Sequence, residues 1–450
     1  MASGSGTGVT STGRGGGATS SYSTPASLLP SAINAAPSAS YIVSSHPLSS
    51  SASSSMGPTD LALSRSFIPR TSSLKDSMES YRAYRDERKE PHGVLRTYDI
   101  LGFLSSGTYG RVYKARLKED NALALKRNRR AAGSGAFSRT AAAERDAKIL
   151  AEEESNVFAI KKFKPDKEEQ TGYTGISQSA MREIALNREL SHINLVTLRE
   201  VILEDKAIYM VFAYAEHDLL QLIHHHHVTL RSSISSAVLK SILHQLLYGL
   251  SYLHSHAVLH RDLKPANILL TSSGILKIAD LGLARLSSQP LQSLYTGDKV
   301  VVTIWYRSPE LLLGARHYGT AVDVWAVGCI WGELLALRPM FKGDEAKGDG
   351  KKGTPFQGDQ LKRIVEVLGT PTKDRWNDID LMPEYKTWWP HLRLEGYPGA
   401  LYHWYTVRAK TSSGFDLLEN LLQYDPAKRL SAAQALDHPW FKEMPLPTAE

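Results

Sequence analysis

The sequence predicts an α+β fold, because strand-like and helix-like patterns occupy different parts of the chain. Short apolar runs occur within residues 98–117 and 157–163, as is typical of strands. Later in the chain, apolar residues recur at helical spacing from Ile242 to Leu253. Residues 321–337 are apolar all round, which predicts a helix buried at the centre of a large helical region. With 450 residues, of which 42% are hydrophobic, the chain is long enough to bury such a core.

The composition argues against several classes of protein. Cys329 is the only cysteine, so neither an intrachain disulfide nor a cysteine-based zinc site can form, which fits a reducing interior. The net charge of +7 comes without an alternation of basic and aromatic residues, so we expect no direct nucleic-acid binding. The pattern of a signal peptide is absent, and Asp323 and Glu333 interrupt the longest apolar stretch. We therefore expect neither secretion nor a membrane span.

The first part of the chain divides into two segments. Residues 1–72 are rich in Ser, Gly, Ala, Thr and Pro, a composition that predicts a disordered leader. Residues 73–96 are charged, and Met78, Tyr81 and Tyr84 lie roughly a helical turn apart. This spacing predicts a short docking helix, with a solvated linker as the alternative.

The main domain is expected over residues 97–442, followed by a short tail at 443–450. An insertion at about residues 118–155 separates two strands that would otherwise be joined by a tight turn. Its basic cluster, from Lys126 to Arg130, indicates either a nuclear-import signal or an exposed surface loop.

Two local patterns predict further elements of this domain. Residues 257–285 follow a helical stretch and contain two apolar runs around a Ser-Ser-Gly turn, which predicts a loop and then a hairpin. Near the end, Ser431 and Gln434 form a capping-box pattern, which predicts a short helix that closes the domain.

Several motifs follow one another in the order SSGTYGRVY, FAIK, SAMREIAL, HRDLKPAN, DLG and WYRSPE. Together they resemble the motifs of eukaryotic protein kinases over about residues 97–442. A single motif of this kind is a weak signal, whereas their order is a strong one. The resemblance implies a bilobal fold, with a small β-rich N-lobe and a larger α-helical C-lobe. It also implies phosphoryl transfer from ATP with Mg²⁺ to serine or threonine.

The resemblance implies that a glycine-containing loop covers the ATP phosphates. Gly107 and Gly110 lack side chains, so backbone N–H groups can approach the phosphate oxygens. Ser105 stands where the family has its first glycine, and Val112 is expected to pack on the adenine ring. The expected ATP contacts from this loop are Leu104, Ser105, Ser106, Gly107, Thr108, Tyr109, Gly110, Arg111 and Val112.

Later motifs imply further ATP contacts. Lys161 resembles the lysine that holds the α and β phosphates, and Glu183 resembles the helix glutamate that pairs with it. Phe212 is expected at the back of the adenine pocket and Asp218 at its mouth. Backbone hydrogen bonds to the adenine are expected from Ala213, Tyr214 and Ala215.

The HRDLKPAN and DLG motifs imply the catalytic and metal-binding groups. Asp262 resembles the residue that orients the substrate hydroxyl, and Lys264 resembles the lysine that neutralises the transferring phosphoryl group. Thr303 is expected to brace both. Asn267 and Asp280 are the expected magnesium ligands, because amide and carboxylate oxygens suit a hard cation.

Four consecutive histidines, His224–His227, are expected in an exposed loop. A metal site is disfavoured there, because no spaced carboxylate or cysteine accompanies them.

The resemblance also implies how the enzyme is switched. Three arginines resemble those that gather round a phosphothreonine in many kinases, namely Arg182, Arg261 and Arg285. Asp298 stands where that threonine is usual, so we expect activation without a phosphate there. The alternatives are a surface acid without a role, and phosphorylation of Tyr295 or Thr296.

Further resemblances concern the substrate and the large lobe. Val301 and Val302 resemble a pocket that selects proline after the target serine or threonine. Glu310 and Arg429 are expected to form a buried ion pair that ties the activation segment to the large lobe. Ser308 replaces the usual alanine, a change that we expect to be neutral.

The helix that carries Glu183 is apolar on two faces, so a second surface must cover it. Glu183 shares one face with Leu186 and Leu190, whereas Met181, Ile184 and Ala185 point largely the other way. In cyclin-dependent kinases the second surface is the cyclin, and SAMRE resembles their signature.

The combination of SQSAMREIALNREL, FAYAEHDL, Asp298 and a charged insert between Phe341 and Phe356 resembles the Mediator-associated cyclin-dependent kinases. This resemblance implies cyclin C and Mediator kinase-module subunits as partners, a nuclear location, and the RNA polymerase II C-terminal domain and transcription factors as substrates. One alternative is another cell-cycle or transcriptional cyclin-dependent kinase. The other is a silent scaffold, which is disfavoured because Ser105, Leu281 and Ser308 depart from the family without changing a group that handles phosphate or metal.

Overall fold

The computed structural model describes residues 78–79, 82, 93–106, 110–119, 156–163, 178–205, 207–287, 303–346 and 355–447, and the statements below refer to them. The chain divides into two units, Met1–Lys75 and Asp76–Glu450, and all the described residues lie in the second. The predicted leader and residues 120–155 of the insertion, with its basic cluster, lie outside the described residues. Of the predicted docking helix, Met78, Glu79 and Arg82 are described, and they are helical.

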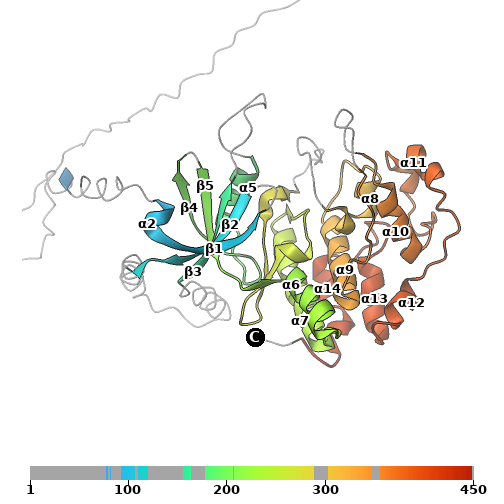
Figure 1. The fold of residues 1–450 in the computed structure, drawn as a ribbon. Coiled ribbons are helices and arrows are strands. Elements are labelled where there is room, and N and C mark those ends of the chain that lie inside the picture. The colour runs from blue at the N-terminus through green and yellow to red at the C-terminus, as the bar shows by residue number, and fades with distance from the viewer. Residues whose placement is uncertain are drawn as a thin grey trace, which may run out of the picture. The chain divides into compact units, whose positions relative to one another are not determined.

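An antiparallel sheet of five strands forms the N-terminal part of this unit, in the order β1-β2-β3-β5-β4 (Figure 1). The strands are β1 (Tyr98–Ser106), β2 (Gly110–Leu117), β3 (Val157–Phe163), β4 (Leu198–Glu204) and β5 (Ala207–Ala213). Val112 of β2 pairs with Lys161 of β3, which pairs in turn with Met210 of β5. The register between β2 and β3 is unbroken, so the insertion between them leaves their pairing intact.

Each face of the sheet carries its own apolar cluster, because successive side chains of a strand point to opposite faces. Phe158 and Val211 belong to one cluster, which also buries Val94 of the short helix α2 (Val94–Thr97). Met210 and Phe212 belong to the other cluster, which lies on the side of helix α5 (Gln178–Glu189). The sheet therefore positions α5 and the strand residues that face it.

Helices dominate the remainder of the unit (Figure 1). The α-helices are α6 (Leu219–His224), α7 (Ser236–Ser255), α8 (Pro309–Leu312), α9 (Ala321–Ala336), α10 (Gly358–Leu368), α11 (Tyr385–Leu392), α12 (Leu401–Thr406), α13 (Ser412–Leu421) and α14 (Ala432–Leu436). The 3₁₀ helices are η2 (Pro265–Asn267), η3 (Leu281–Leu283), η4 (Ile304–Tyr306), η5 (Ile379–Leu381) and η6 (Pro439–Lys442). Short strands complete the set, namely β6 (His217–Asp218), β7 (Val258–Leu259), β8 (Ile268–Leu270), β9 (Leu276–Ile278) and β10 (Arg285–Leu286).

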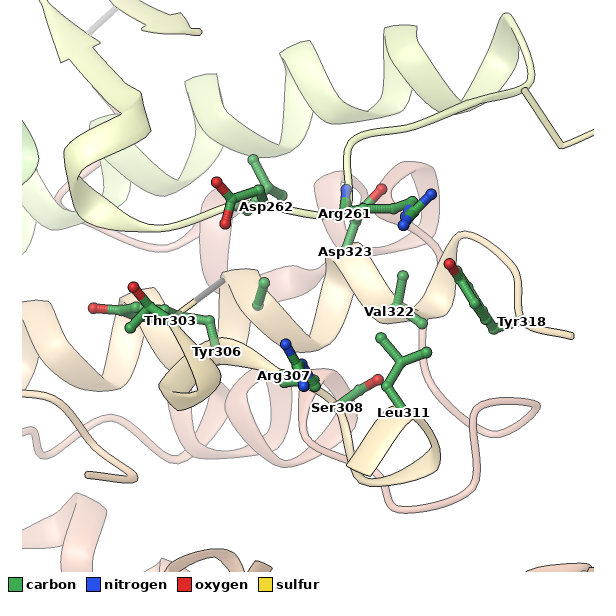
Figure 2. A pocket seen from close by; sticks show the side chains of 12 residues that line it. Arg261, Asp262, Thr303, Tyr306, Arg307, Ser308, Leu311, Tyr318, Val322 and Asp323 are labelled. Carbon is green, nitrogen blue, oxygen red and sulfur yellow. Dashed lines mark hydrogen bonds between the residues drawn. The ribbon is translucent and has the colours of Figure 1, made fainter. Parts of the chain in front are cut away.

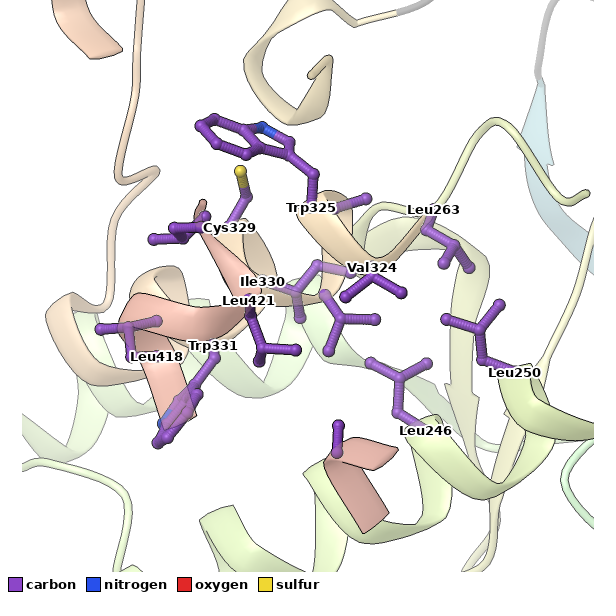
Figure 3. Close-up of a cluster of buried hydrophobic side chains, with 14 of the residues drawn as sticks. Leu246, Leu250, Leu263, Val324, Trp325, Cys329, Ile330, Trp331, Leu418 and Leu421 are labelled. Atoms are coloured by element: carbon purple, nitrogen blue, oxygen red, sulfur yellow. The ribbon is translucent and has the colours of Figure 1, made fainter. Parts of the chain in front are cut away.

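Helix α9 lies at the centre of the helical part, where its side chains meet those of α7 and α13 (Figure 3). Trp325 and Ile330 are completely buried, as the apolar run predicts for a helix covered on all sides. Asp323 and Glu333 are buried as well, so each needs a polar partner. The predicted α+β, bilobal fold is confirmed.

Two shorter predictions are also confirmed. Strands β8 and β9 form the hairpin expected around the Ser-Ser-Gly turn. Helix α14 begins with the capping box of Ser431 and Gln434, in which each residue bonds the backbone N–H of the other.

The loop expected at His224–His227 is wrong. His224 ends α6, and a π-helical turn, η1 (His225–Leu230), continues from it. The helix continues because the backbone N–H of His225 bonds the carbonyls of Gln221 and Leu222. Within the described residues, no group of three His, Cys, Asp or Glu side chains is placed to hold a metal ion.

Candidate active site

Lys161 lies on β3, where it forms a buried ion pair with Glu183 of α5. Its Nζ donates to the two carboxylate oxygens of Glu183 at 2.7 and 2.9 Å. A third bond of 3.0 Å runs from the same Nζ to Oδ1 of Asp280, at the start of η3. The Lys161 side chain is 13% exposed and that of Glu183 is 2% exposed, so the pair is largely shielded from water. The predicted pairing of Lys161 with Glu183 is present, and it joins the sheet to the helical part.

Burial and charge act in opposite directions on this cluster. Burial favours the neutral amine, but the carboxylates of Glu183 and Asp280 outweigh it and raise the pKa of Lys161. Burial raises the pKa of Glu183 to about 7, although Lys161 opposes the shift. For Asp280, burial works against the charged form, yet the Lys161 ammonium holds the pKa of this carboxyl below its ordinary range. Lys161 is thus held protonated, as a phosphate-binding group must be.

Asp262 lies in a loop between β7 and η2, together with the other residues of the HRDLKPAN motif. Lys264 Nζ donates to its Oδ2 at 2.7 Å. Asn267 Nδ2 donates both to the Asp262 carbonyl at 2.8 Å and to Oδ2 at 3.1 Å. Burial raises the pKa of Asp262, and the Lys264 ammonium opposes the shift. The loop therefore fixes Oδ2 of Asp262, whereas Oδ1 accepts no hydrogen bond from the described residues.

The carboxylate of Asp323, on α9, fixes the backbone of the loop that carries Asp262. It accepts hydrogen bonds from the backbone N–H groups of His260 and Arg261, both at 2.8 Å, and lies 3.0 Å from Nε2 of His254. The bonds stabilise Arg261 at φ 71°, in the left-handed region that non-glycine residues seldom adopt. Sequence reasoning treated Asp323 only as an interruption of an apolar run. An acid in an otherwise apolar, buried helix is the signal that would have found it.

Asn267 and Asp280 are able to hold a divalent cation. Because Asn267 donates through its amide nitrogen, its amide oxygen remains available as a ligand. Asp280 uses only Oδ1 in its bond to Lys161, so its second oxygen is also available. Two protein ligands are typical of Mg²⁺ sites in which phosphate and water supply the rest.

The expected adenine pocket is bounded by β2, β3 and the end of β5. Phe212, expected at the back of this pocket, is 7% exposed and pairs with Ala159 of β3. The backbone N–H of Ala213 already donates to the carbonyl of Thr197 at 2.9 Å, so it is not available to adenine. Tyr214 and Ala215 follow as the remaining backbone donors of the segment. Their neighbour Lys114 lies over the Tyr214 ring at 4.3 Å.

Asp218 has a structural role that the sequence did not indicate. It caps α6 by accepting the backbone N–H of Gln221 at 2.7 Å, within a reciprocal capping box. Burial raises its pKa, and the backbone bond opposes the shift. Any contact to a ligand must therefore use the oxygen that does not cap the helix.

The phosphate loop is described at both ends but not at its tip. Leu104 is 43% exposed at the end of β1, and Ser105 and Ser106 pair with Val112 and Arg111 of β2. A Cβ at Gly110 would lie 2.3 Å from the carbonyl oxygen of Lys162, so glycine is needed there for the approach of β3. The tip residues Gly107, Thr108 and Tyr109 lie outside the described residues.

Thr303 and Asp262 line one pocket beside the catalytic loop (Figure 2). Arg307 and Leu311 continue the lining of this catalytic-loop pocket towards α8. Thr303 forms no hydrogen bond with Asp262 or Lys264 in the described part of the chain.

The three predicted phosphate-binding arginines have other contacts here. Arg182 donates to the carbonyl of Gly282 at 2.6 Å, which ties α5 to η3. The Arg261 guanidinium lies 5.9 Å from the Tyr318 ring centre, and Arg285 donates to a neighbouring carbonyl. Residues of the activation segment that sequence reasoning singled out lie outside the described residues, namely Tyr295, Thr296, Asp298, Val301 and Val302.

The second face of α5 is only partly covered. Met181 is 51% exposed and Ala185 is exposed, one helical turn apart. Ile184 instead packs against the apolar cluster of the sheet. The exposed apolar side chains of α5 are therefore those of Met181 and Ala185.

Comparison with known proteins decides the family. The protein kinase domain family matches residues 127–441, most of the chain. The chain belongs to the protein kinase family. This kinase is 55% identical to the serine/threonine-protein kinase SSN3 of Mycosarcoma maydis, over 85% of this chain and 64% of that protein. It is 54% identical to SSN3 of Yarrowia lipolytica, over 78% of this chain and 79% of the relative.

Each of these relatives is named as a serine/threonine-protein kinase. A third relative, SSN3 of Coccidioides immitis, is 51% identical over 82% of this chain and 77% of its own length. The kinase spans less than two thirds of the Mycosarcoma maydis protein. The family match begins at residue 127, after β1 and β2, although these strands pair with β3 in one sheet. Membership implies that ATP and a divalent cation are used. In the described part of the kinase, no helix is both long and apolar enough to span a membrane.

Proposed function

We propose that this kinase transfers the γ-phosphate of ATP to serine or threonine followed by proline, when activated by a cyclin. The observation that carries the proposal is the contact of Lys161 with both Glu183 and Asp280. It brings together the phosphate-binding lysine and a metal-binding carboxylate, which a silent scaffold has no need to maintain.

The mechanism follows from the geometry of the loop around Asp262. The substrate hydroxyl attacks the γ-phosphorus, its proton passes to the carboxylate of Asp262, and the bond to ADP breaks. Burial makes Asp262 more basic, which favours proton acceptance. Lys264 lies 2.7 Å from Asp262, so its ammonium is close to the charge that develops on the phosphoryl group. Asn267 and Asp280 would hold the divalent cation, which would supply positive charge to offset that of the phosphates.

The partner that we propose for the uncovered face of α5 is cyclin C. Met181 and Ala185 offer an exposed apolar surface on the helix that carries Glu183. A cyclin that covers this face would fix α5, and with it the ion pair to Lys161. Similarity to SSN3 kinases supports a place in the Mediator kinase module in the nucleus. The proposed substrates are the RNA polymerase II C-terminal domain and transcription factors.

The test measures phosphate transfer to a peptide of Ser-Pro repeats, with and without cyclin C. We expect transfer only in the presence of cyclin C, and none from Asp280→Ala. Met181→Glu should abolish both cyclin binding and activity, because it places a charge in an apolar contact. Leu203→Glu is the matched control, since Leu203 is 70% exposed on β4, outside α5.

The possible outcomes separate the alternatives. Full activity of Met181→Glu would contradict a cyclin-dependent kinase. Activity with a different cyclin only would favour another cell-cycle or transcriptional kinase. Absence of transfer with every cyclin, together with retained cyclin binding, would favour the scaffold.

A further inference from the structure

A second pocket lies next to the catalytic-loop pocket and has no role in the mechanism above. It is bounded by α8, by the segment that leads into α10, and by α11, and its volume is about 580 Å³. Leu311, Leu312, Pro355, Phe356 and Trp388 supply its apolar lining. This α8–α11 pocket is within the usual size range of sites that hold a bulky side chain or a small ligand.

The apolar walls of the α8–α11 pocket are held in place by contacts within the fold. The Phe356 and Trp388 rings stack at a centroid distance of 5.1 Å and an interplanar angle of 4°. Helix α11 is anchored at its start, because the N–H of Glu384 donates to the carbonyl of Leu313 at 3.0 Å. Trp388 nevertheless remains 41% exposed, which is unusual for so large an apolar side chain. A preformed aromatic wall that faces solvent favours binding of an apolar group.

The charges around the α8–α11 pocket favour a ligand in which an acidic group lies next to the apolar one. Arg307 and Arg316 both line it, together with one acid, Glu384. Among the described residues neither guanidinium forms an ion pair. Two guanidinium groups against one carboxylate leave a positive excess, and arginine binds carboxylates in well-defined geometry.

The α8–α11 pocket adjoins the catalytic-loop pocket. Arg307 and Leu311 line both pockets. Figure 2 shows these two residues in the catalytic-loop pocket, together with Asp262. Because the two pockets share these residues, a substrate chain with its serine at Asp262 would need to extend only past Arg307 to reach the second pocket. We propose that the α8–α11 pocket docks a second segment of the protein substrate, in which a bulky apolar or aromatic residue adjoins an acidic one. This inference rests on the proposed function and adds a substrate preference to it.

The test compares peptides that share one Ser-Pro pair. In one series a Gly/Ser linker of about two to twelve residues joins this pair to a Phe-Asp module, placed on either side. In the other series Gly-Ser replaces the module. With the kinase–cyclin complex we expect kcat/KM to be about tenfold higher for the best Phe-Asp peptide, mainly through a lower KM. Equal values at every linker length would overturn the proposal.

Matched variants test whether the preference for the Phe-Asp peptide depends on the α8–α11 pocket. Trp388→Ala should remove it, whereas Tyr402→Ala, which truncates a 65% exposed aromatic residue outside the pocket, should retain it. Arg316→Glu should lower the preference for Asp, whereas Lys386→Glu, an exposed change on α11 outside the pocket lining, should not. All four variants should phosphorylate the Gly-Ser peptides normally. A preference that persists in Trp388→Ala would contradict the assignment.

A binding measurement separates this inference from the proposed function. A labelled Phe-Asp peptide with alanine in place of the target serine is titrated against the complex, with fluorescence anisotropy as the readout. Binding that requires Trp388 supports the docking pocket even if no peptide is phosphorylated. Phosphorylation without any such binding would overturn the docking pocket and leave the kinase activity standing.

Discussion

Ser308 and Ser431 each precede a helix, but of these two only Ser431 uses its hydroxyl as a cap. Ser431 accepts the N–H of Gln434 at the start of α14. Ser308 precedes α8, is completely buried, and its Oγ has no hydrogen-bond partner in the described part of the chain. Burial of a hydroxyl costs desolvation free energy, and without a hydrogen-bond partner nothing offsets this cost.

Alanine at these two serines should therefore have opposite effects. The sequence suggested that serine instead of alanine is neutral here. The unpaired hydroxyl changes that expectation, and Ser308→Ala should raise the free energy of unfolding by about 1 kcal/mol. Ser431→Ala should lower it by about 1 kcal/mol, because it removes a cap. Urea unfolding of both variants and of the parent protein measures these two changes in the free energy of unfolding. A loss of stability in Ser308→Ala would show that its hydroxyl has a partner after all.

Glu333 provides a second residue-scale prediction, on pH. Its carboxyl accepts the hydroxyl of Tyr306 at 2.6 Å, and burial raises its pKa above the ordinary value of 4.5, with the Tyr306 bond opposing. As pH rises, the unfolded chain releases this proton first, so the residue destabilises the folded state above its unfolded pKa. Glu333→Gln removes that effect and keeps an acceptor for Tyr306.

The stability of Glu333→Gln relative to the parent should thus increase as pH rises from about 4 to about 8. Tm measured across this range gives the comparison. Glu419→Gln, at an exposed position of α13, is the control and should show no such trend. A difference in Tm that is constant with pH would contradict the raised pKa of Glu333.

At the scale of elements, α9 determines the position of the catalytic loop through one side chain. Burial works against the charge of Asp323, yet the His254 hydrogen bond, nearby His260 and the Arg261 N–H keep its pKa below the ordinary range. In Asp323→Asn the amide can turn only one oxygen towards three donors. The loop that carries Asp262 should then lose its fixed position.

Asp323→Asn should lower kcat by about a hundredfold, because a misplacement of about 1 Å has effects of that order. KM for ATP should change little, since Lys161 is not affected. Asp416→Asn is the control, because Asp416 also bonds a histidine, His438, at 2.8 Å, but is 62% exposed. Parent-like kcat in Asp323→Asn would show that the loop holds its position without this carboxylate.

The elements also show what the sequence could predict and what it could not. The buried helix α9 and the capping box of α14 follow from local pattern, and both were predictable from residues close together in the chain. Lys161 and Glu183 lie 22 residues apart, and motif order was enough to pair them. Pattern in one helix also predicted the uncovered Met181, but not the packing of Ile184 against the sheet.

What the sequence missed depends on contacts made by the finished fold. The N–H of Ala213 is occupied by Thr197 because strand β4 and its preceding segment lie beside β5. Asp323 meets the backbone of His260 across 63 residues, a contact that no local pattern records. The run of histidines suggested a loop, but the helical backbone of α6 continues into a π-helical turn at His225–Leu230. Local propensity is a weak guide here.

At the scale of the whole molecule, one buried ion pair joins distant parts of the helical region. Arg429 Nη1 and Nη2 donate to the two oxygens of Glu310 at 2.9 and 3.0 Å. The side chains of Glu310 and Arg429 are 3% and 0% exposed. Arg429 also donates to the carbonyls of Ala321, Gln423 and Tyr424. The start of α8, the start of α9 and the segment before α14 therefore share one guanidinium.

Removal of one charge from this pair should weaken all these connections together. Glu310→Gln leaves the Arg429 guanidinium buried without its counter-charge, and we expect the free energy of unfolding to fall by about 3–5 kcal/mol. Asp380→Asn, which breaks the exposed pair with Lys373, should have little effect, because water and salt screen such pairs.

Hydrogen exchange distinguishes a cooperative role of this pair from a local one. If Arg429 joins the three segments, then amides near Glu310, at the start of α9 and around Tyr424 should all exchange faster in Glu310→Gln, by a similar factor. Faster exchange at α8 alone would mean that the backbone carbonyls hold Arg429 without the carboxylate. In that case Glu310 would stabilise the end of the activation segment only. The apolar contacts of α9 would then be what holds the helical region together.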